Sequence, residues 1–410
     1  MQDCARKSEE PTPGRDRVEF GYHVIGPILA DMLRRLSAHL HAVRDAHAPV
    51  VFFCSRGGLV LRRTLDIYAE RVGLDLPLRC QDFMISRLAA FRAAFQLDPL
   101  AVAPLIEVEF AGETCSQAAR ALWNVTADDD SRWNAPFTLQ RLLELTRDGR
   151  LGEQIRSIND AQSSLLRRHI DLLRDGNPRV LLCDTGVFGS ILRYLQVGVP
   201  AIDWRLILLF RANYKRIPAP HFHSTTGIVS ESDVYLPWRS HTAVLLYWQL
   251  IEALLEPALP SVRFYHAGAD GHVVSDLEIP GWQAQLEAPA RSALAGACCY
   301  LRTLTPASLP SIERLAQRAW CRLRRMIVFP SARDVSLLAV GSRSLDFGRD
   351  EVVRFTGHRD GPGRSRRERI SLAANSMWPE GELRTQLTRG AAPVLLAWEL
   401  SRWIRALNPW

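Results

Sequence analysis

The sequence predicts an α/β fold built on a parallel sheet, because apolar runs of strand length alternate with segments at helical spacing. Residues 50–54 and 180–183 are continuous apolar runs, which are typical of strands buried on both faces of a sheet. Each run is followed by a turn that contains glycine and then by an amphipathic segment. Strand, turn and helix in that order form the repeating unit of a parallel sheet, which binds ligands at the carboxyl ends of its strands.

The turn after residues 180–183 is the most informative stretch for function. It consists of Asp184, Thr185, Gly186, Val187, Phe188 and Gly189, and we expect a helix to begin at about Ser190. Glycines let backbone N–H groups approach an anion closely, and the amino end of a helix adds partial positive charge. A carboxylate ahead of the turn can accept hydrogen bonds from sugar hydroxyls. The stretch predicts a sugar-phosphate site; the alternative is that Gly186 and Gly189 serve only the backbone of the turn.

A second turn of the same kind follows residues 50–54. Ser55, Arg56, Gly57 and Gly58 precede a helix that we expect over residues 59–72. Two such units place two anion-binding turns at one edge of a parallel sheet. We therefore expect a ligand with a phosphate at each end.

The two turns together resemble those of the type I phosphoribosyltransferases. In that family a glycine loop after an early strand holds pyrophosphate, and a later loop holds the ribose 5-phosphate of phosphoribosyl pyrophosphate (PRPP). Residues 55–58 match the first loop, and residues 184–190 match the second loosely. The family usually has two adjacent acids where this chain has Asp184 and Thr185, and Phe188 stands where a hydroxyl residue is common. The resemblance implies a Rossmann-like parallel sheet of phosphoribosyltransferase type.

A closer resemblance extends over roughly residues 20–385. Motifs at residues 20–27, 52–58, 85–87, 184–186 and 255–257 are similar to a domain from bacterial surface-polysaccharide gene clusters, which is often fused to a HAD-type phosphatase. The first loop of that domain is commonly Ser-Arg-Asp-Gly, and this chain has Gly57 in place of the Asp. The resemblance implies transfer of 5-phosphoribose from PRPP to a sugar hydroxyl, followed by dephosphorylation to ribofuranose by a separate HAD-type phosphatase.

The resemblance also implies roles for individual residues. Mg²⁺ would bridge the pyrophosphate and the ribose hydroxyls of PRPP, and Asp184 would hold those hydroxyls directly and serve as the metal ligand. The backbone amides of residues 186–190 would bind the 5-phosphate. The residues expected around the pyrophosphate are Ser55, Arg56, Gly57, Gly58 and Arg87, and the alternative for Arg87 is a surface or helix-capping role.

Other polar groups have two interpretations each. Glu252 and Glu256 share one face of a helix expected over residues 241–256. This face is either solvated, or it carries the base that deprotonates the acceptor hydroxyl, for which Glu252 is the candidate. The candidate phosphate or acceptor contacts after an expected strand at residues 204–210 are Arg211, Asn213, Lys215 and Arg216. His221 with His223, and the acidic residues 128–130, carry only weak metal-binding signals.

The chain is expected to form one α/β core with additions. Residues 1–17 are expected to be a flexible leader, residues 18–240 the core with a helical insertion at about 88–176, and residues 241–410 a mostly helical region that completes the core and the acceptor site. Further expected elements are a helix over residues 26–43, a strand over 76–80, a hairpin of 262–266 with 272–276, helices over 283–304 and 310–327, and strands over 335–340 and 352–355.

The composition predicts a soluble cytoplasmic protein. The chain has 410 residues, of which 47% are hydrophobic, and no apolar run reaches the length of a membrane span. Its first residues are polar, and its eight cysteines include no C-x-x-C pair. The net charge of +7 favours anionic ligands, and the basic residues 358–369 offer a contact for a lipid-linked acceptor or the inner face of a membrane.

Two other functions remain as alternatives. A degenerate phosphate site would make the chain a nucleotide-binding or scaffold protein without turnover. A different acceptor would make it a phosphoribosyltransferase that acts on a small molecule. Nucleic-acid binding is not expected, because the basic residues are not interleaved with aromatic ones in a recognisable module.

Overall fold

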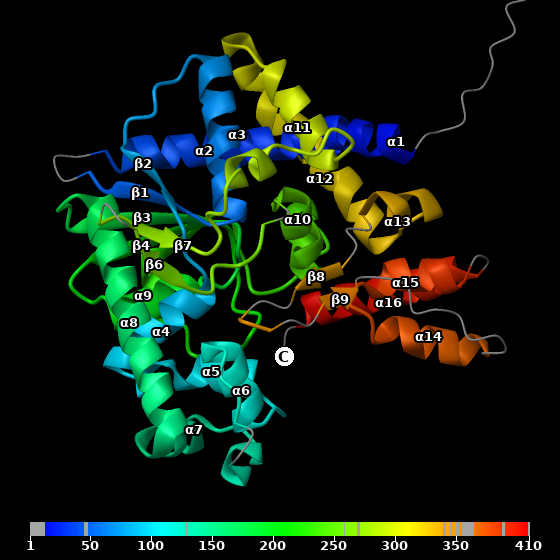
Figure 1. The fold of residues 1–410 in the computed structure, drawn as a ribbon. Helices are drawn as coiled ribbons and strands as arrows, with labels where there is room; N and C mark the ends of the chain where they lie inside the picture. Colours follow the sequence, from blue (N-terminus) through cyan, green and yellow to red (C-terminus); the bar gives the residue numbers. More distant parts are fainter. Residues whose placement is uncertain are drawn as a thin grey trace, which may run out of the picture.

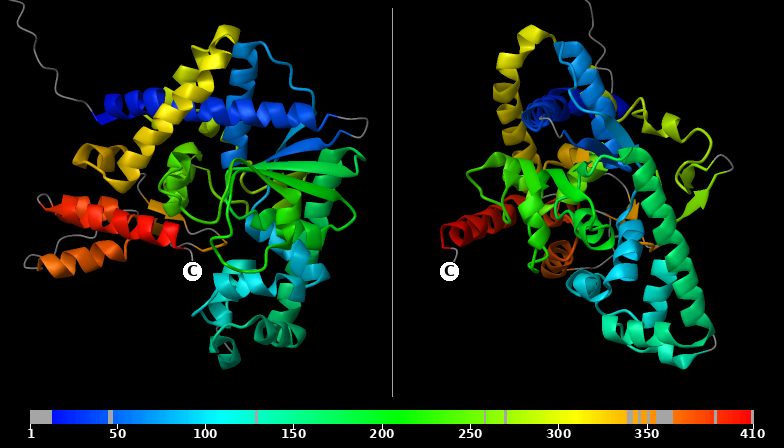
Figure 2. Two further views of the ribbon diagram at one scale, coloured as in Figure 1. Left: turned by 180° about the vertical axis from the view of Figure 1, so that it is seen from behind. Right: turned by 90° about the vertical axis from the view of Figure 1, so that its left-hand side faces the viewer.

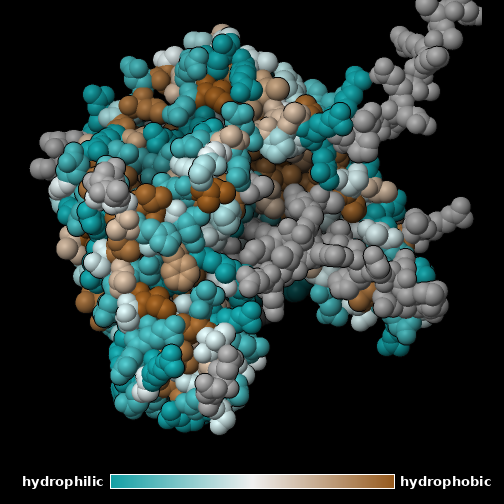
Figure 3. Space-filling view, in the orientation of Figure 1, coloured by the Kyte–Doolittle hydropathy of each residue, from teal (hydrophilic) through white to brown (hydrophobic). Residues whose placement is uncertain are grey.

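A computed structural model gives the fold of the chain. It describes residues 13–44, 48–127, 130–257, 259–268, 271–338, 342–344, 347–349, 352–354, 365–387 and 390–408. Across these residues, no helix is both long enough and apolar enough to span a bilayer. The face seen in Figure 3 is mainly hydrophilic, with hydrophobic residues scattered over it.

The centre of the fold is a five-stranded sheet in which all neighbouring strands are parallel. In sheet order the strands are β2 (Cys80–Phe83), β1 (Val50–Cys54), β3 (Arg179–Asp184), β4 (Asp203–Arg211) and β5 (Thr225–Glu231). The predicted α/β fold with a parallel sheet is therefore confirmed. Because β1 and β3 are hydrogen-bonded neighbours, the turns that follow them leave the sheet side by side.

Helices cover both faces of this sheet and extend beyond its edges (Figure 1, Figure 2). Those before β3 are α1 (Pro13–Phe20), α2 (Gly26–Ala42), α3 (Gly57–Val72), α4 (Arg87–Leu97), α5 (Ala103–Glu109), α6 (Cys115–Trp123), α7 (Leu139–Arg147) and α8 (Gly149–Arg174). Those after β3 are α9 (Ser190–Gly198), α10 (Trp248–Leu255), α11 (Ala293–Arg302), α12 (Leu309–Val328), α13 (Ala332–Leu338), α14 (Arg366–Ala374), α15 (Pro379–Gln386) and α16 (Ala391–Leu407). Two antiparallel pairs are also present, β6 (Tyr265–Ala267) with β7 (Val273–Ser275) and β8 (Ser342–Ser344) with β9 (Val352–Arg354).

The residues of the central strands alternate between two hydrophobic cores. Val51 and Phe53 of β1 pack with residues of α2, α3, α11 and α12, whereas Val50 and Phe52 pack with residues of α4, α8 and α9. All four side chains are at most 4% exposed. Burial on both faces explains why β1 reads as a continuous apolar run.

Glycines allow α11 to cross the amino-terminal helices closely. One π-helical turn, Gly21–Ile25, joins α1 to α2. A side-chain carbon at Gly21 would overlap the backbone of Ala293, and one at Gly26 would lie 2.7 Å from Cγ of Tyr300. Both partners belong to α11, so these two glycines of the motif at residues 20–27 have a packing role.

The carboxyl-terminal helices α14, α15 and α16 form a layer beside α12 and α13 (Figure 1). The buried carboxylate of Glu399 accepts hydrogen bonds from Tyr235 Oη at 2.7 Å and from Arg324 Nη2 at 2.6 Å. Trp378 is fully buried, and its Nε1 donates to the carbonyl of Ile327 at 3.0 Å. Because a buried charge is tolerated only when it is paired, these contacts hold the layer on the core.

Several expectations about the ends of the chain and its strands are wrong. Residues 13–17 belong to α1 instead of a flexible leader, and residues 1–12 lie outside the described part. The strand expected at residues 335–340 is helical through Leu338. The strand expected at residues 76–80 begins only at Cys80.

Two further differences lie near the sheet. β5 was not expected, because it is a half-exposed edge strand that contains Gly227 and therefore lacks a strong apolar pattern. The helix expected over residues 241–256 is interrupted at Tyr247, whose φ of −147° is extended, so that only α10 is α-helical. Of the basic segment 358–369, residues 358–364 lie outside the described part, and α14 begins at Arg366.

Candidate functional site

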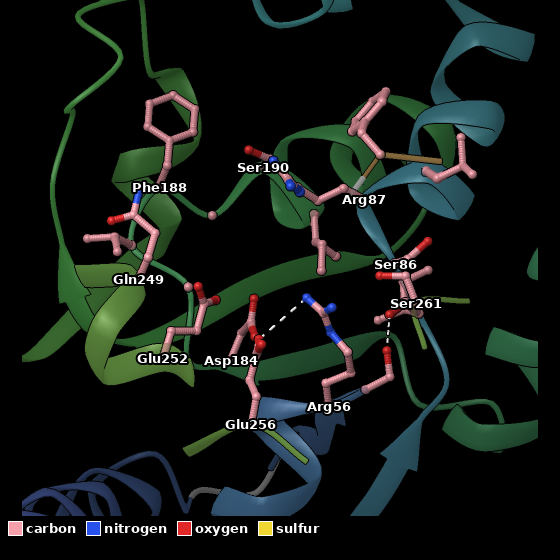
Figure 4. A pocket seen from close by; sticks show the side chains of 18 of the residues that line it. Arg56, Ser86, Arg87, Asp184, Phe188, Ser190, Gln249, Glu252, Glu256 and Ser261 are labelled. Atoms are coloured by element: carbon pink, nitrogen blue, oxygen red, sulfur yellow. Dashed lines mark hydrogen bonds and ion pairs between the residues drawn. The ribbon is translucent and has the colours of Figure 1, made fainter. Parts of the chain in front are cut away.

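A cavity of about 250 Å³ opens at the carboxyl edge of the sheet. Its walls come from the turns after β1, β2, β3 and β4, from α10, and from residues 261–263 and 347–348 (Figure 4). The predicted site residues that line it are Ser55, Arg56, Arg87, Asp184, Gly186, Val187, Phe188, Gly189, Ser190 and Glu252. Gly57, Gly58 and Thr185 are buried and are not part of the lining.

The turn after β3 directs the amino end of α9 at the cavity. Gly189 immediately precedes α9 and has a φ of 75°, a conformation that favours glycine. Both Gly186 and Ser190 line the cavity, so the turn and the first residue of the helix border the same space. Unpaired backbone N–H groups at a helix start attract anions, as the sequence predicts for this turn.

Asp184 is the last residue of β3 and borders the cavity. The N–H of Thr185 donates to its Oδ1 at 2.8 Å. Burial raises the pKa of Asp184, although backbone hydrogen bonds and the charges of Arg56 and Arg87 act in the opposite direction. A carboxylate that is costly to keep charged gains from a cation placed beside it.

Asp184 fits the role of a magnesium ligand. Mg²⁺ is usually held by one or two carboxylates together with substrate phosphates, and Asp184 offers such oxygens at a cavity wall. Among the residues that the structure describes, no three His, Cys, Asp or Glu side chains are grouped as a metal site. The carboxylate would therefore bind the ion jointly with a ligand.

His221 supports the turn after β3. Its Nε2 lies 2.7 Å from the carbonyl oxygen of Phe188 and must donate, because a carbonyl only accepts. The two rings also pack edge-on, with centroids 4.9 Å apart. Burial is the main cause that lowers the pKa of His221 to about 4, so the imidazole is neutral at physiological pH. We assign His221 a positioning role for Phe188, since it and His223 belong to no metal group in the described residues.

Arg56, in the turn after β1, has an unusual backbone conformation. It precedes α3 with a φ of 68°, which is rare outside glycine and is found at functional sites. Its Nη2 lies 3.4 Å from Oε1 of Glu256, and both side chains are at most 15% exposed. In Figure 4 the carboxyl groups of Asp184, Glu252 and Glu256 all point toward the part of the cavity next to Arg56.

Gly57 and Gly58 bring the two turns into contact. A side-chain carbon at Gly57 would overlap Oγ1 of Thr185 and lie 2.9 Å from its Cβ and Cγ2. One at Gly58 would lie 2.7 Å from the carbonyl oxygen of Cys183. The two glycines therefore let α3 approach β3 and the turn after it, and we assign them a packing role behind the cavity wall.

The remaining candidates divide into two groups. Arg87 and Lys215 both line the cavity, and both are near the carboxylate of Glu109. Arg211 instead pairs with Glu231 at 2.9 Å, and the side-chain amide of Asn213 donates to the carbonyl of Ile217. These two residues stabilise the exit of β4.

Part of the lining had no signal in the sequence. Glu109 comes from α5 in the predicted insertion, Ser261 and Arg263 from the segment before β6, and Phe347 from the carboxyl-terminal region. Only tertiary structure brings these segments to the edge formed by β1 and β3. Comparison of the chain with known proteins adds no assignment, since no protein-family model matches it and no curated protein matches it significantly.

Proposed function

We propose that the chain is a glycan phosphoribosyltransferase, which transfers 5-phosphoribose from PRPP to a hydroxyl of a surface-polysaccharide acceptor and releases pyrophosphate. The observation that supports this most directly is the pairing of two strand–turn–helix units at one cavity. The turns after β1 and β3 both border it, and Asp184 lies with them. A donor with a phosphate group at each end of a ribose matches this arrangement. The acceptor class rests on the resemblance of the sequence motifs.

In this proposal the two ends of PRPP bind at different turns. The 5-phosphate binds the backbone amides of residues 186–190 at the start of α9, where the helix dipole favours an anion. The pyrophosphate binds Ser55, Arg56 and Arg87, all of which line the cavity. Asp184 accepts hydrogen bonds from the ribose hydroxyls between the two ends.

The transfer forms one bond and breaks one. The acceptor hydroxyl oxygen bonds to C1 of the ribose while the bond from C1 to the pyrophosphate oxygen breaks, and pyrophosphate leaves with the electron pair. The hydroxyl proton passes to a carboxylate, for which Glu252 is our candidate because it is buried, lines the cavity and lies next to Asp184 (Figure 4). Arg56 and Arg87 neutralise the charge that develops on the leaving group.

Mg²⁺ bound by Asp184 together with the pyrophosphate would supply further positive charge to the leaving group. The chain lacks the second adjacent acid of the phosphoribosyltransferase loop and the Asp that is common at position 57. Glu252 and Glu256 bring two carboxylates to the same cavity from α10 and its carboxyl end. We propose that they take over the functions of the missing acids.

The 5-phosphate of the product would be removed by a separate HAD-type phosphatase, leaving ribofuranose. A lipid-linked acceptor would place the reaction at the inner face of a membrane, where the chain would act as a peripheral cytoplasmic protein. Neither the phosphatase nor the lipid-linked acceptor requires a second active site in this chain.

A second candidate is a nucleotide-binding or scaffold protein without turnover. One observation favours it, namely that the ion pair with Glu256 already engages Arg56. An arginine held in this way is less available to a leaving group than one that faces the cavity alone. Turnover distinguishes the two candidates.

Calorimetric titration with PRPP tests the proposal, with and without Mg²⁺ and against ribose 5-phosphate and pyrophosphate alone. We expect Mg²⁺-dependent binding of PRPP that is tighter than that of either fragment. Asp184→Asn should weaken it by about tenfold or more, because a charge-assisted contact is lost. Asp82→Asn is the matched control, since Asp82 pairs with Arg62 at 2.8 Å away from the cavity.

Two outcomes would count against the proposal. Failure of PRPP to bind at millimolar concentration, in protein with an unchanged unfolding midpoint, would overturn it. Binding without release of pyrophosphate in the presence of glycan acceptors would favour the second candidate.

A further inference from the structure

Three cations surround the carboxylate of Glu109, a residue that lines the cavity. Lys215 Nζ lies 3.1 Å from Oε2 of Glu109, Arg349 Nη1 lies 3.5 Å from its Oε1, and Arg87 Nη1 lies 3.8 Å from its Oε2. Glu113 adds one more carboxylate, 2.7 Å from Arg349 Nη2. The five side chains come from α4, α5, the segment after α5, the turn after β4 and the segment at residues 347–349. We call this group the Glu109 cluster.

The Glu109 cluster carries more positive than negative charge. Its three cations face two carboxylates, and the Glu109 side chain is only 14% exposed. Burial alone would raise the pKa of Glu109, but the charges of Arg87, Lys215 and Arg349 together hold it below its ordinary value. The carboxylate is therefore ionised, and its charge holds the three cations around it.

Lys215 has unused hydrogen-bond donors that border the cavity. An ammonium group has three N–H donors, and within the described residues Lys215 donates to Glu109 only. Its side chain is 7% exposed and forms part of the cavity lining. A buried ammonium is costly unless its charge and donors are satisfied. An anionic ligand group in the cavity would satisfy both.

The Glu109 cluster adjoins the proposed donor site and is built from different elements. The charge of Arg87 acts to lower the pKa of both Asp184 and Glu109, so the cluster is electrostatically linked to the donor site. Lys215, Glu109 and Arg349 belong to neither of the two turns that border the donor site. Two anion-binding turns already account for the two ends of PRPP. Lys215, which has no role at the donor, is therefore available to the second substrate.

We propose that the Glu109 cluster is an anion subsite for the acceptor, so that the sugar that receives 5-phosphoribose carries a carboxylate or a phosphate next to the reacting hydroxyl. This inference rests on the proposed function, because it takes the two turns as the donor site. Lys215 supplies hydrogen bonds to the anion, and Glu109 holds the lysine and the two arginines in place.

Lysine-selective ¹⁵N labelling gives a direct probe of this subsite. Lys7 and Lys215 are the only lysines in the chain, so a spectrum of the labelled ammonium groups holds two signals and Lys7 serves as the internal control. Lys215→Arg identifies the signal by removing it. The probes are D-galacturonate, D-galactose 1-phosphate and neutral D-galactose, each added to protein saturated with PRPP and Mg²⁺.

We expect galacturonate or galactose 1-phosphate to shift the Lys215 signal in a saturable way, while galactose leaves it in place. The probe that binds tells a carboxylate acceptor from a phosphorylated one. By calorimetry, Lys215→Met should weaken that binding by about tenfold or more, and Lys215→Arg should retain most of it. Retained PRPP binding in Lys215→Met shows that the variant is folded.

The outcomes separate this inference from the proposed function. A Lys215 signal that moves with PRPP alone and then ignores both anions would assign the cluster to the donor and overturn the acceptor subsite, with the proposed function intact. No shift with either anion at millimolar concentration would also overturn it. Anion shifts in a protein that fails to bind PRPP would retain an anion subsite but remove its assignment to an acceptor.

Discussion

Replacing Gly57 by alanine tests why glycine is needed at position 57. The packing role predicts that close contact between the two turns requires it, instead of contact with a phosphate. The added carbon would overlap Oγ1 of Thr185 and lie 2.9 Å from two of its carbons. Ordinary carbon contacts begin at about 3.5 Å, so the turns must separate by at least half an ångström or Thr185 must move. Thr185 is 8% exposed and lies against the start of α3, which leaves little room for movement.

Overpacking of this kind costs about 1 to 3 kcal/mol of the free energy of unfolding, and we expect Gly57→Ala to fall in that range. Thr185→Ala removes two of the three close atoms. It also removes a buried hydroxyl that lacks a hydrogen-bond partner, so alone it should cost less than Gly57→Ala. The double variant should recover about 1 kcal/mol relative to the sum of the single ones. Separation of the turns should also weaken PRPP binding, because its two ends bind on opposite sides of this contact.

Urea unfolding of wild type, the two single variants and the double variant measures the coupling free energy between positions 57 and 185, and calorimetry measures PRPP binding. Gly186→Ala is the control, since the carbon added there would meet only the side chain of Asp184, at 3.2 Å from Oδ2, and should cost less stability than Gly57→Ala. Equal stability of Gly57→Ala and wild type would refute the packing role. Additive effects in the double variant would show that Thr185 is not the obstacle.

Two predictions concern charge. Glu256→Gln removes one ion-pair partner of Arg56, so pyrophosphate no longer competes with the Glu256 carboxylate for this arginine and should bind about 2- to 10-fold more tightly by calorimetry. Weaker binding would mean that Glu256 positions Arg56 for the ligand. Burial is the main cause that lowers the pKa of His221 to about 4 in the folded chain. Between about pH 6.5 and pH 4 the unfolded chain therefore binds the proton more readily than the folded chain. The free energy of unfolding falls as pH falls through this window. Wild type should therefore lose about 2 kcal/mol more than His221→Gln between pH 7 and pH 5 in urea unfolding, and equal losses would contradict the assignment.

Within the central sheet, the strands that the sequence predicts best are those buried on both faces, and the predicted hairpin is also present as β6 and β7. β1 is a continuous apolar run, and β3 and β4 each contain one, because helices cover both sides of the sheet; such runs have few other interpretations. β5 lies at an edge and is half exposed, so its residues need not be apolar. The expected strand at residues 335–340 failed because a short apolar run with Val335 and Leu337 fits a helix that buries one face equally well.

The candidate site also has a part that local sequence predicts and a part that only long-range packing forms. The turns after β1 and β3 could be predicted, because a strand, a glycine turn and a helix are adjacent in the sequence and their order fixes their geometry locally. Even there, spacing could not separate glycines that border the ligand space from glycines that pack behind it. Gly186 and Gly189 line the cavity, whereas Gly57 and Gly58 lie against Thr185 and Cys183.

The other wall of the cavity follows from long-range packing, which no local pattern encodes. Glu252 and Glu256 share a face at helical spacing, and a solvated face was as reasonable as a site until α10 was placed over the sheet edge. Glu109 had no signal, because one acid at the end of a helix is usually solvated. Its importance lies in the three cations that gather around it from distant segments. On our proposal the local turns bind the donor and the long-range wall selects the acceptor, so the acceptor is the part of the function that sequence motifs alone determine least.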